Sequence, residues 1–284
     1  GAQARRFAFF ATGDVGDDDG QQSQTAASIL RTAPRPALGL ITGDVVYPDG
    51  RSSDYDANLM ARWRDLLCTV PVWPALGNHD WHVDPETNFR REWYLPGNEH
   101  WYSLDHGSAH FVALDTREGT LYEADKQLAW LAADLQTHDS EWTFVYFHHP
   151  GETCTYKGPT RDVVDRLLPI LQEHRVDVVF NGHAHTYERL YPLRDGKPVD
   201  VGQEPNYDDP QRPIYIVTGA GMKTKEGKPT RLCGPTAFFK DSTVLWSHVV
   251  VEGPRCTIRA IESDGDRVLD QITITKSGLA SLTP

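Results

Sequence analysis

Residues 7–16 read FAFFATGDVG, an apolar and aromatic run that stops at a glycine followed by an aspartate. Residues 37–47 read ALGLITGDVVY and repeat this pattern of a short apolar run, a glycine and an aspartate. Such runs are typical of buried β-strands that lead into sharp turns. The carboxylate of each turn is then presented at the end of a strand, where α/β proteins place their functional sites.

Three more blocks place metal-binding side chains beside a glycine or at the end of an apolar run. With the first two they are Gly13-Asp14-Val15-Gly16, Gly43-Asp44-Val45-Val46-Tyr47, Gly77-Asn78-His79-Asp80, Val145-Tyr146-Phe147-His148-His149 and Gly182-His183-Ala184-His185. Each block alone also fits a structural turn, but five coincidences make that interpretation the least favoured. The set could fill two adjacent metal sites and leave imidazoles for a substrate.

The segments between the blocks predict alternating strands and helices. We expect strands at 7–12, 37–42, 70–75, 101–105, 110–115, 142–147, 176–180, 214–218, 243–252, 256–262 and 268–275, and helices at 21–33, 54–67, 123–138 and 161–174. Residues 191–213 are rich in Pro, Gly and Asp and predict a long surface loop. Because no repeat or linker interrupts the chain, we expect one domain over residues 1–284, with frayed ends at 1–5 and 276–284.

The charge balance limits the classes of partner. The chain of 284 residues has 28 basic and 40 acidic residues, a formal net charge of −12. This balance argues against nucleic acid and anionic membranes as partners, because both require basic surfaces. No apolar stretch is long enough to span a bilayer. An anionic phosphate substrate would need local positive charge, which favours a site built around cations.

The four cysteines show no metal-binding spacing. Cys68 and Cys256 lie in a helix-like and a strand-like stretch, so we expect both to be buried thiols. Cys154 and Cys233 lie in loop-like surroundings, and we predict that they form a disulfide, which implies an oxidising compartment. The start of the chain has no signal-peptide core, so a secreted or periplasmic protein without its signal peptide is expected.

Three local features separate the metal-binding interpretation from the structural one. A tyrosine such as Tyr47 is usually packed in a core, but beside an Asp-rich cluster it could be a phenolate ligand for a hard ion such as Fe(III). His148-His149 would point to opposite faces if the strand continued through them. His183 and His185 are two residues apart and would share a face, which suits ligands of two neighbouring metals.

The remaining histidines lack this context, so we expect them to be structural or surface residues: His82, His100, His106, His110, His138, His174 and His248. An aromatic cluster lies between residues 81 and 102 and comprises Trp81, Trp93, Tyr94, Trp101 and Tyr102. Core packing is the favoured interpretation of this cluster. An aromatic wall that stacks on a substrate ring is the alternative.

Taken together, the five blocks resemble the five-motif pattern of the metallophosphoesterases. Tyr47 at the end of the second block makes the chain similar to the purple acid phosphatases, as do the stretches 183–189 (HAHTYER) and 214–221 (IYIVTGAG). The resemblance covers roughly residues 7–221. It implies an α/β fold, a four-layer αββα sandwich of two mixed β-sheets packed face to face.

The resemblance also implies two metal ions. The first, expected to be Fe(III), would have the ligands Asp14, Asp44, Tyr47 and His185. The second, Fe(II), Zn(II) or Mn(II), would have the ligands Asp44, Asn78, His148 and His183. Asp44 would bridge the ions, and His79 and His149 would face the substrate. The place of His149 directly after a ligand departs from variants that have this histidine farther on.

The implied activity is hydrolysis of phosphate monoesters with inorganic phosphate as product. A hydroxide on the metal centre would attack phosphorus, while His79 and His149 stabilise charge and protonate the leaving group. A phosphodiesterase or nucleotide hydrolase with the same centre is the first alternative, with specificity set by loops 81–100, 152–160 and 222–240. A phosphate-binding protein without turnover is the second, and the presence of both histidines disfavours it. The oligomeric state is left open.

Overall fold

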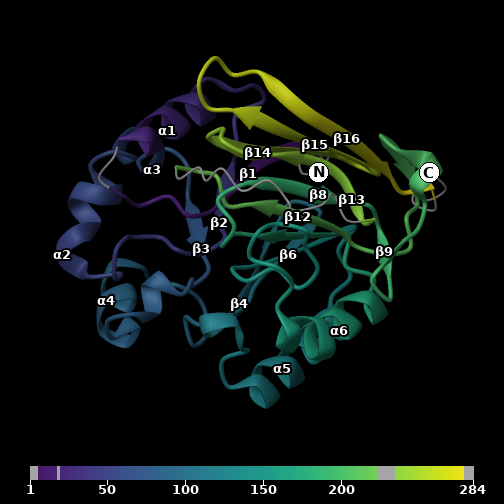
Figure 1. Ribbon diagram of the computed structural model, residues 1–284, viewed down its shortest axis with the longest axis horizontal. Coiled ribbons are helices and arrows are strands. Elements are labelled where there is room, and N and C mark those ends of the chain that lie inside the picture. Colours follow the sequence, from purple (N-terminus) through teal and green to yellow (C-terminus); the bar gives the residue numbers. More distant parts are fainter. Residues whose placement is uncertain (1–5, 18–19, 223–233, 278–284) are drawn as a thin grey trace.

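A computed structural model describes residues 6–17, 20–222 and 234–277, without the side chains of residues 85 and 86. Two seven-stranded mixed β-sheets lie face to face, and helices lie on their outer sides (Figure 1). A separate two-stranded ribbon is formed by β9 (Leu193–Arg194) and β10 (Lys197–Pro198). The predicted four-layer sandwich of two mixed sheets is confirmed.

The first sheet has the strand order β11-β16-β15-β14-β1-β2-β3. Its strands are β1 (Arg6–Thr12), β2 (Leu38–Ile41), β3 (Val72–Pro74), β11 (Asn206–Asp208), β14 (Leu245–Glu252), β15 (Arg255–Glu262) and β16 (Val268–Thr275). β1, β2 and β3 run parallel to one another. Their carboxyl ends therefore lie at one edge of the sheet, while β14, β15 and β16 form an antiparallel meander beside β1.

The second sheet has the strand order β13-β8-β12-β7-β6-β5-β4. Its strands are β4 (Tyr102–His106), β5 (Ala109–Ala113), β6 (Trp142–Phe147), β7 (Val178–Asn181), β8 (Tyr187–Leu190), β12 (Ile214–Thr218) and β13 (Thr236–Lys240). β5, β6, β7 and β12 are parallel, and β4 pairs with β5 as the predicted hairpin. This sheet also gathers its parallel carboxyl ends at one edge.

The helices are α1 (Gln21–Arg31), α2 (Ser52–Tyr55), α3 (Arg64–Leu67), α4 (Pro85–Glu92), α5 (Ala124–Thr137) and α6 (Leu168–Glu173). α5 and α6 lie below the second sheet in Figure 1, whereas α1 and α3 lie beside the first sheet. α2 and α4 contact each other at the side of the molecule. Among the described helices, none has the length and apolar character needed to cross a membrane.

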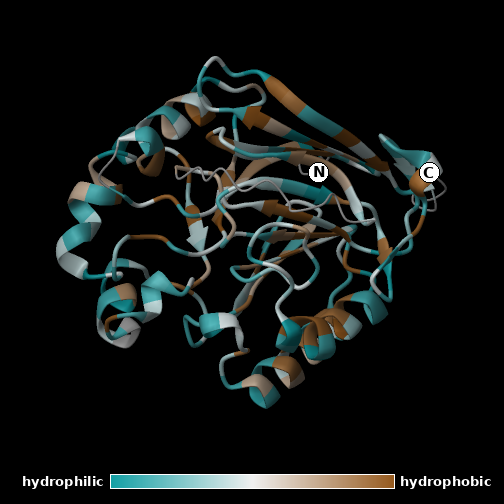
Figure 2. Ribbon diagram, viewed as in Figure 1, coloured by the Kyte–Doolittle hydropathy of each residue, from teal (hydrophilic) through white to brown (hydrophobic). Residues whose placement is uncertain are grey.

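Aromatic side chains hold the two sheets together. The ring of Phe9 on β1 meets those of Phe111 on β5 and Phe144 on β6 edge-on, at centroid distances of 5.0 and 4.8 Å. Such pairs contribute roughly 0.5–1.5 kcal/mol each beyond the area they bury. A second apolar cluster that includes Leu131 and Leu171 fills the space between the second sheet and helices α5 and α6. Figure 2 shows hydrophobic residues along the strands and alternating hydropathy on the helices.

The structure corrects several predicted elements. The single helix expected at 54–67 is interrupted, because a π-helical segment at Asp56–Met60 and a turn separate α2 from α3. The loop expected at 191–213 contains β9, β10 and β11, and β11 pairs with β16. α4, β8 and β13 are absent from the sequence prediction. The sequence of α4 has few apolar residues, and β8 and β13 depend on pairing with strands that are distant in sequence.

The cysteines follow the prediction in part. Cys256 is buried as expected, but Cys68 is exposed, so the prediction of a buried thiol at Cys68 is wrong. The residue lies directly after the short helix α3, on its solvent side. Cys154 is disulfide-bonded. Cys233, the partner predicted for it, lies outside the described residues.

Two further residues differ from their predicted surroundings. Tyr94 is 97% exposed, whereas its neighbours Trp93, Trp101 and Tyr102 are buried as expected. Lys276, expected at the start of a frayed tail, is anchored because its Nζ lies 2.7 Å from Asp177 Oδ1. Residues 1–5 and 278–284 lie outside the described part of the chain.

Candidate metal centre

The five sequence blocks meet at one edge of the sandwich. The first three follow β1, β2 and β3 of the first sheet, and the last two follow β6 and β7 of the second sheet. Backbone hydrogen bonds join these loops: Gly13 N donates to Thr218 O, and Gly182 N donates to His148 O, both at 3.0 Å. The first of these bonds connects the two sheets, so the carboxyl ends of both sheets build one site.

The loops that carry the five blocks pack closely and have an unusual backbone conformation. A Cβ at Gly77 would lie 2.1 Å from Asp44 N and 2.3 Å from Asp44 Oδ1, so only glycine fits there. Asp14, Asp44 and His183 adopt left-handed conformations, with φ of 58°, 49° and 68°. Residues other than glycine rarely do so, and such conformations cluster at functional sites, where the surrounding structure enforces them.

Asp14, Asp44, Tyr47 and His185 form an oxygen-rich group. Tyr47 Oη lies 3.0 Å from Asp14 Oδ1, 2.9 Å from Asp44 Oδ2 and 3.3 Å from His185 Nε2. His185 Nε2 is in turn 3.3 Å from Asp14 Oδ1. The two carboxylates and the phenol are buried. The Tyr47 phenol has one proton, so it can donate a full hydrogen bond to only one of the two carboxylates. Its contact with the other carboxylate oxygen then has no proton between the two oxygen atoms.

His148 is the centre of a second, nitrogen-rich group. Its Nδ1–H donates to Thr42 O at 2.9 Å, which fixes the ring so that Nε2 faces the other side chains of the site. This Nε2 lies 3.3 Å from Asp44 Oδ2 and 3.2 Å from Asn78 Oδ1. The ring of His183 lies 5.0 Å from that of His148. Asp44 Oδ2 therefore takes part in both groups.

Charge links the two groups. Burial would raise the pKa of Asp44, but the charge and hydrogen bond of His148 hold that pKa far below its ordinary value. Burial opposes protonation of His148, yet Asp44 raises the pKa of His148 to about 9. Burial and the neighbouring charge of His148 lower the pKa of His149 to about 3, and the same causes lower the pKa of His183 further. Two of the three imidazoles are thus held neutral, the form that binds metal.

The donor set fits two cations. Burial and the carboxylates beside it raise the pKa of Tyr47 well above its ordinary value, so a phenolate there requires a cation in place of its proton. The ligand atoms of Asp14, Asp44 and His148 lie within 4.8 Å of one another, and so do those of His148, His149 and His183. Metal–ligand bonds are ~2.0–2.2 Å long, so small shifts would let side chains from these two overlapping sets bind adjacent ions.

His79 and His149 approach the centre in different ways. His79 Nδ1–H donates to Pro48 O at 2.6 Å, and its Nε2 lies 3.9 Å from Asp44 Oδ2. The side chain of His79 is 30% exposed, so this nitrogen is open to a ligand entering the site. His149 is buried, with Nδ1 3.1 Å from Thr116 Oγ1. Both lie at the site, as the resemblance implies, but only His79 reaches solvent.

The paired histidines are arranged partly as predicted. The condition under which His148 and His149 would point to opposite faces is not met, because β6 ends at Phe147, and the two rings lie 4.9 Å apart. His183 and His185 do serve different groups, since His183 lies beside His148 and His149 whereas His185 contacts the oxygen-rich group.

Several residues that hold the site in place are missing from the sequence interpretation. Asp80 is buried and accepts hydrogen bonds from Gly77 N at 2.8 Å and Val45 N at 3.1 Å, which joins the second and third loops. Asp80 belongs to the third block, so its position was a usable signal. Thr116 accepts from the backbone N of His149 at 3.0 Å, and no sequence pattern points to it.

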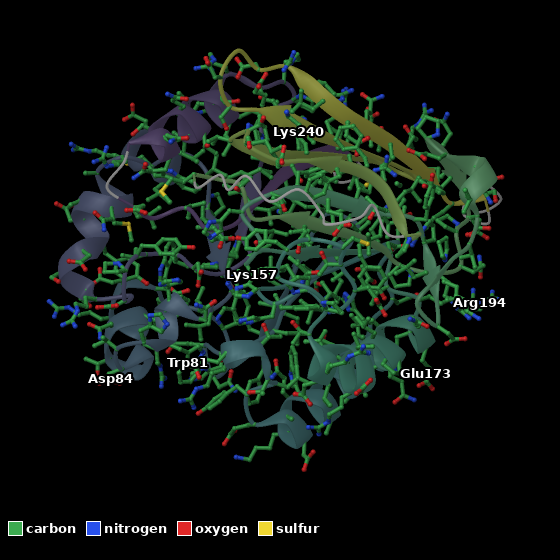
Figure 3. The ribbon with its side chains drawn as sticks, viewed as in Figure 1. Trp81, Asp84, Lys157, Glu173, Arg194 and Lys240 are labelled. Carbon is green, nitrogen blue, oxygen red and sulfur yellow. The ribbon has the colours of Figure 1, made fainter. Side chains whose placement is uncertain are left out.

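The rim of the site carries cations and an aromatic ring. The positive charge of Lys157 contributes to the lowered pKa values of His149 and His183, so Lys157 lies within electrostatic range of these imidazoles. Arg117 Cζ lies 4.4 Å from the ring centroid of Trp81. In the view of Figure 3, Lys157 lies near the middle of the molecule and Trp81 lies between it and the edge where Asp84 is labelled.

Comparison with known proteins gives a family. Residues 7–187 match the family model described as Calcineurin-like phosphoesterase. Acid phosphatase type 7 of Danio rerio is 25% identical over 312 residues, which span 95% of this chain and 68% of that protein.

Solved structures share the fold. Purple acid phosphatase PPD1 from yellow lupin seeds has a TM-score of 0.83 at 21% identity and covers 95% of this chain and 54% of its own. GAP50, the anchor in the inner membrane complex of Plasmodium, has a TM-score of 0.77 at 15% identity, with 95% and 89% covered. At these identities the structures indicate the fold alone, and the chain spans between about half and two thirds of the two phosphatases.

Proposed function

Because the chain belongs to the calcineurin-like phosphoesterase family, we propose that it hydrolyses phosphate monoesters at the candidate metal centre. The observation that carries this proposal is the position of Asp44 Oδ2, which lies 2.9 Å from Tyr47 Oη and 3.3 Å from His148 Nε2. A carboxylate oxygen within reach of two donor groups could serve two ions at once, and such ions would stabilise the attacking and leaving oxygens of a phosphoryl displacement.

The proposed ligands follow the two donor groups. An oxygen-rich site suited to a hard ion, Fe(III), has the ligands Asp14, Asp44, Tyr47 and His185. A site richer in nitrogen, suited to Fe(II), Zn(II) or Mn(II), has the ligands Asp44, Asn78, His148 and His183. When bound, the two ions supply the positive charge that an anionic phosphate needs and the acidity that activates water.

The phenol of Tyr47 provides a test of the first metal. A tyrosinate bound to Fe(III) absorbs visible light, so the purified protein is expected to be pink to purple. Tyr47→Phe should lose this colour while elemental analysis still finds iron, because Asp14 and Asp44 remain. A coloured Tyr47→Phe protein would contradict the assignment of Tyr47. A colourless native protein with zinc or manganese in both sites would still fit a hydrolase but would contradict the assignment of iron.

His79 is proposed as the acid that protonates the leaving group. Its bond from Nδ1–H to Pro48 O fixes the ring, so that Nε2 points to the edge of the site where the ester enters. His149 is proposed to hold charge on the phosphate. Thr116 Oγ1 already accepts from His149 N, so its own proton can go to His149 Nδ1 and leave the Nε2 proton for a phosphate oxygen.

Local cations would overcome the unfavourable charge of the whole chain. The formal net charge of −12 repels anions at a distance. At the site, the two ions and the Lys157 ammonium reverse this field over the range of direct contact. A small dianionic monoester gains more from such a concentration of charge than a monoanionic diester, which favours the monoesterase over the phosphodiesterase.

The choice between monoester and diester is tested with paired substrates. We expect kcat/KM for p-nitrophenyl phosphate to exceed that for bis(p-nitrophenyl) phosphate by at least ~10-fold, equivalent to about 1.4 kcal/mol of transition-state stabilisation. A reversed ratio would replace the proposal by the phosphodiesterase. If protein that contains two metal ions hydrolysed neither ester, only the alternative of a phosphate-binding protein without turnover would remain.

An oxidising compartment fits the disulfide of Cys154. We therefore propose that the protein is secreted or periplasmic. Mass analysis of protein prepared from its natural source, with and without reductant, would detect this bond. A reduced Cys154 would contradict the proposed location.

A further inference from the structure

A second group of histidines and carboxylates lies away from the metal centre. It is formed by the hairpin of β4 and β5, which carries Asp105 and His110, and by the end of α5, which carries Asp134 and His138. We propose that Asp105, His110 and His138 form a separate binding site for a divalent cation, with the chemistry of Zn(II).

The three donors converge on one point. Asp105 Oδ1 lies 2.8 Å from His110 Nδ1 and 2.9 Å from His138 Nε2. The two imidazole rings are only 3.4 Å apart between centroids. In a tetrahedral site with bonds of ~2.0 Å, ligand atoms are ~3.3 Å apart, so an outward shift of roughly 0.5 Å would admit the ion. One carboxylate and two imidazoles are ligands that Zn(II) accepts.

The surroundings of His110 match those of a metal-bound histidine. Its other nitrogen, Nε2, lies 2.8 Å from Asp134 Oδ2, and Ser103 Oγ donates to Asp134 Oδ1 at 2.8 Å. A carboxylate that accepts from the far nitrogen of a metal-binding histidine fixes its tautomer and directs the other lone pair to the metal. Without an ion, His110 faces a carboxylate through each nitrogen, which requires a buried imidazolium directly against the ring of His138.

The local charge also calls for a cation. Within the described part of the chain, the ion-pair partners of Asp105 and Asp134 are histidines alone. His138 directly follows α5, whose carboxyl end carries the negative pole of the helix dipole. A divalent ion bound through His110 Nδ1 would displace one proton and would therefore add one net positive charge to the cluster. The side chain of Asp105 is 64% exposed, so the ion and a water ligand have access.

The site is distinct from the metal centre. His110 lies near the start of β5, and Thr116, which contacts His149, follows its carboxyl end. From His110 to the end of β5 at Ala113 the strand rises roughly 10 Å toward the metal centre, and Thr116 lies three residues farther on. An ion here would join the edge hairpin β4–β5 to the end of α5. Its role is therefore to brace this edge of the second sheet, without contact to the substrate.

Counting zinc in matched proteins tests this site. The native protein and the variants His138→Gln and Asp105→Asn are saturated with Zn(II), separated from free metal and analysed by elemental mass spectrometry. The native chain is expected to hold one zinc ion more than either variant, whatever metals occupy the main centre. Both altered side chains reach solvent, and p-nitrophenyl phosphate hydrolysis by the variants should match that of the native protein.

His106→Gln is the control, because His106 lies beside Asp105 on β4 and packs against Phe7 without contacting the site. This variant should keep the extra zinc ion. Zn(II) at about a hundredfold excess over its Kd should also raise Tm by roughly 5 °C in the native and His106→Gln proteins, but by less in the other two. Equal zinc content in native, His138→Gln and Asp105→Asn proteins would overturn the proposal, even if the phosphatase activity proves correct.

Discussion

Asp44→Asn is expected to lower kcat/KM for a phosphate monoester by at least ~10³-fold, equivalent to about 4 kcal/mol of transition-state stabilisation. Asp44 is the residue whose Oδ2 approaches both donor groups, and its Oδ1 accepts from His79 N at 2.8 Å. An amide oxygen keeps the shape of the side chain but removes the negative charge that balances two cations. We expect elemental analysis to find less than the full two ions in the variant.

The matched control for this change is Asp54→Asn, which alters a half-buried aspartate on the short helix α2 without touching the centre. It should leave activity and metal content unchanged. Because Asp44 is buried, the unfolding curve of Asp44→Asn must also show a folded protein before its activity is interpreted. Full activity in a folded, metal-loaded Asp44→Asn protein would contradict the proposal that Asp44 is a ligand shared by the two ions.

His79→Ala is expected to lower kcat by ~10²–10⁴-fold while both metal ions remain bound, which is the range for loss of a general acid. The loss should depend on the leaving group. An alkyl phosphate, whose alkoxide must be protonated as it leaves, should lose more than p-nitrophenyl phosphate, whose phenolate is stable without a proton. The ratio of the two losses therefore reports proton transfer and is insensitive to general damage.

His82→Ala is the control for His79→Ala, because the rings of His79 and His82 lie 4.6 Å apart and His82 is the outer of the two. We expect its activity to remain within a few-fold of the native value, roughly the effect of a surface change of 0.5 kcal/mol. Equal losses on both substrates for His79→Ala would assign His79 to positioning the site rather than to protonation.

The strands that lead into the site were the most predictable part of the fold. β6 and β12 begin and end where the sequence prediction places them, because each is an apolar run with a clear stop. β11 lies within a segment whose composition indicates a loop, and it forms because β16 offers a free edge. The spacing of apolar residues does not distinguish the π-helical segments at Asp56–Met60 and Val163–Leu167 from an α-helix. The sequence therefore predicted an uninterrupted helix in each place.

The site was predictable where its residues carry their own signal. The glycine-flanked blocks bring Asp14, Asp44 and Tyr47 together as expected, but the carbonyl of Thr42 that orients His148 is a backbone group, which no side-chain pattern reveals.

The second histidine cluster shows the same limit. The contact between His110 and His138 joins a strand to the end of a helix 28 positions later, a spacing that matches no local motif. Histidines such as these are distinguished from ordinary surface residues only when the fold places them together.

The central claim is that the five sequence blocks build a metal centre that hydrolyses phosphate esters. Measuring phosphate release before and after metal removal tests this claim most directly. The purified chain is assayed with p-nitrophenyl phosphate, treated with a chelator until elemental analysis finds no iron, zinc or manganese, and assayed again after the ions are restored. We predict that phosphate release is lost on removal and returns on restoration, while Asp44→Asn stays inactive throughout. Undiminished phosphate release by the metal-free chain would contradict the account.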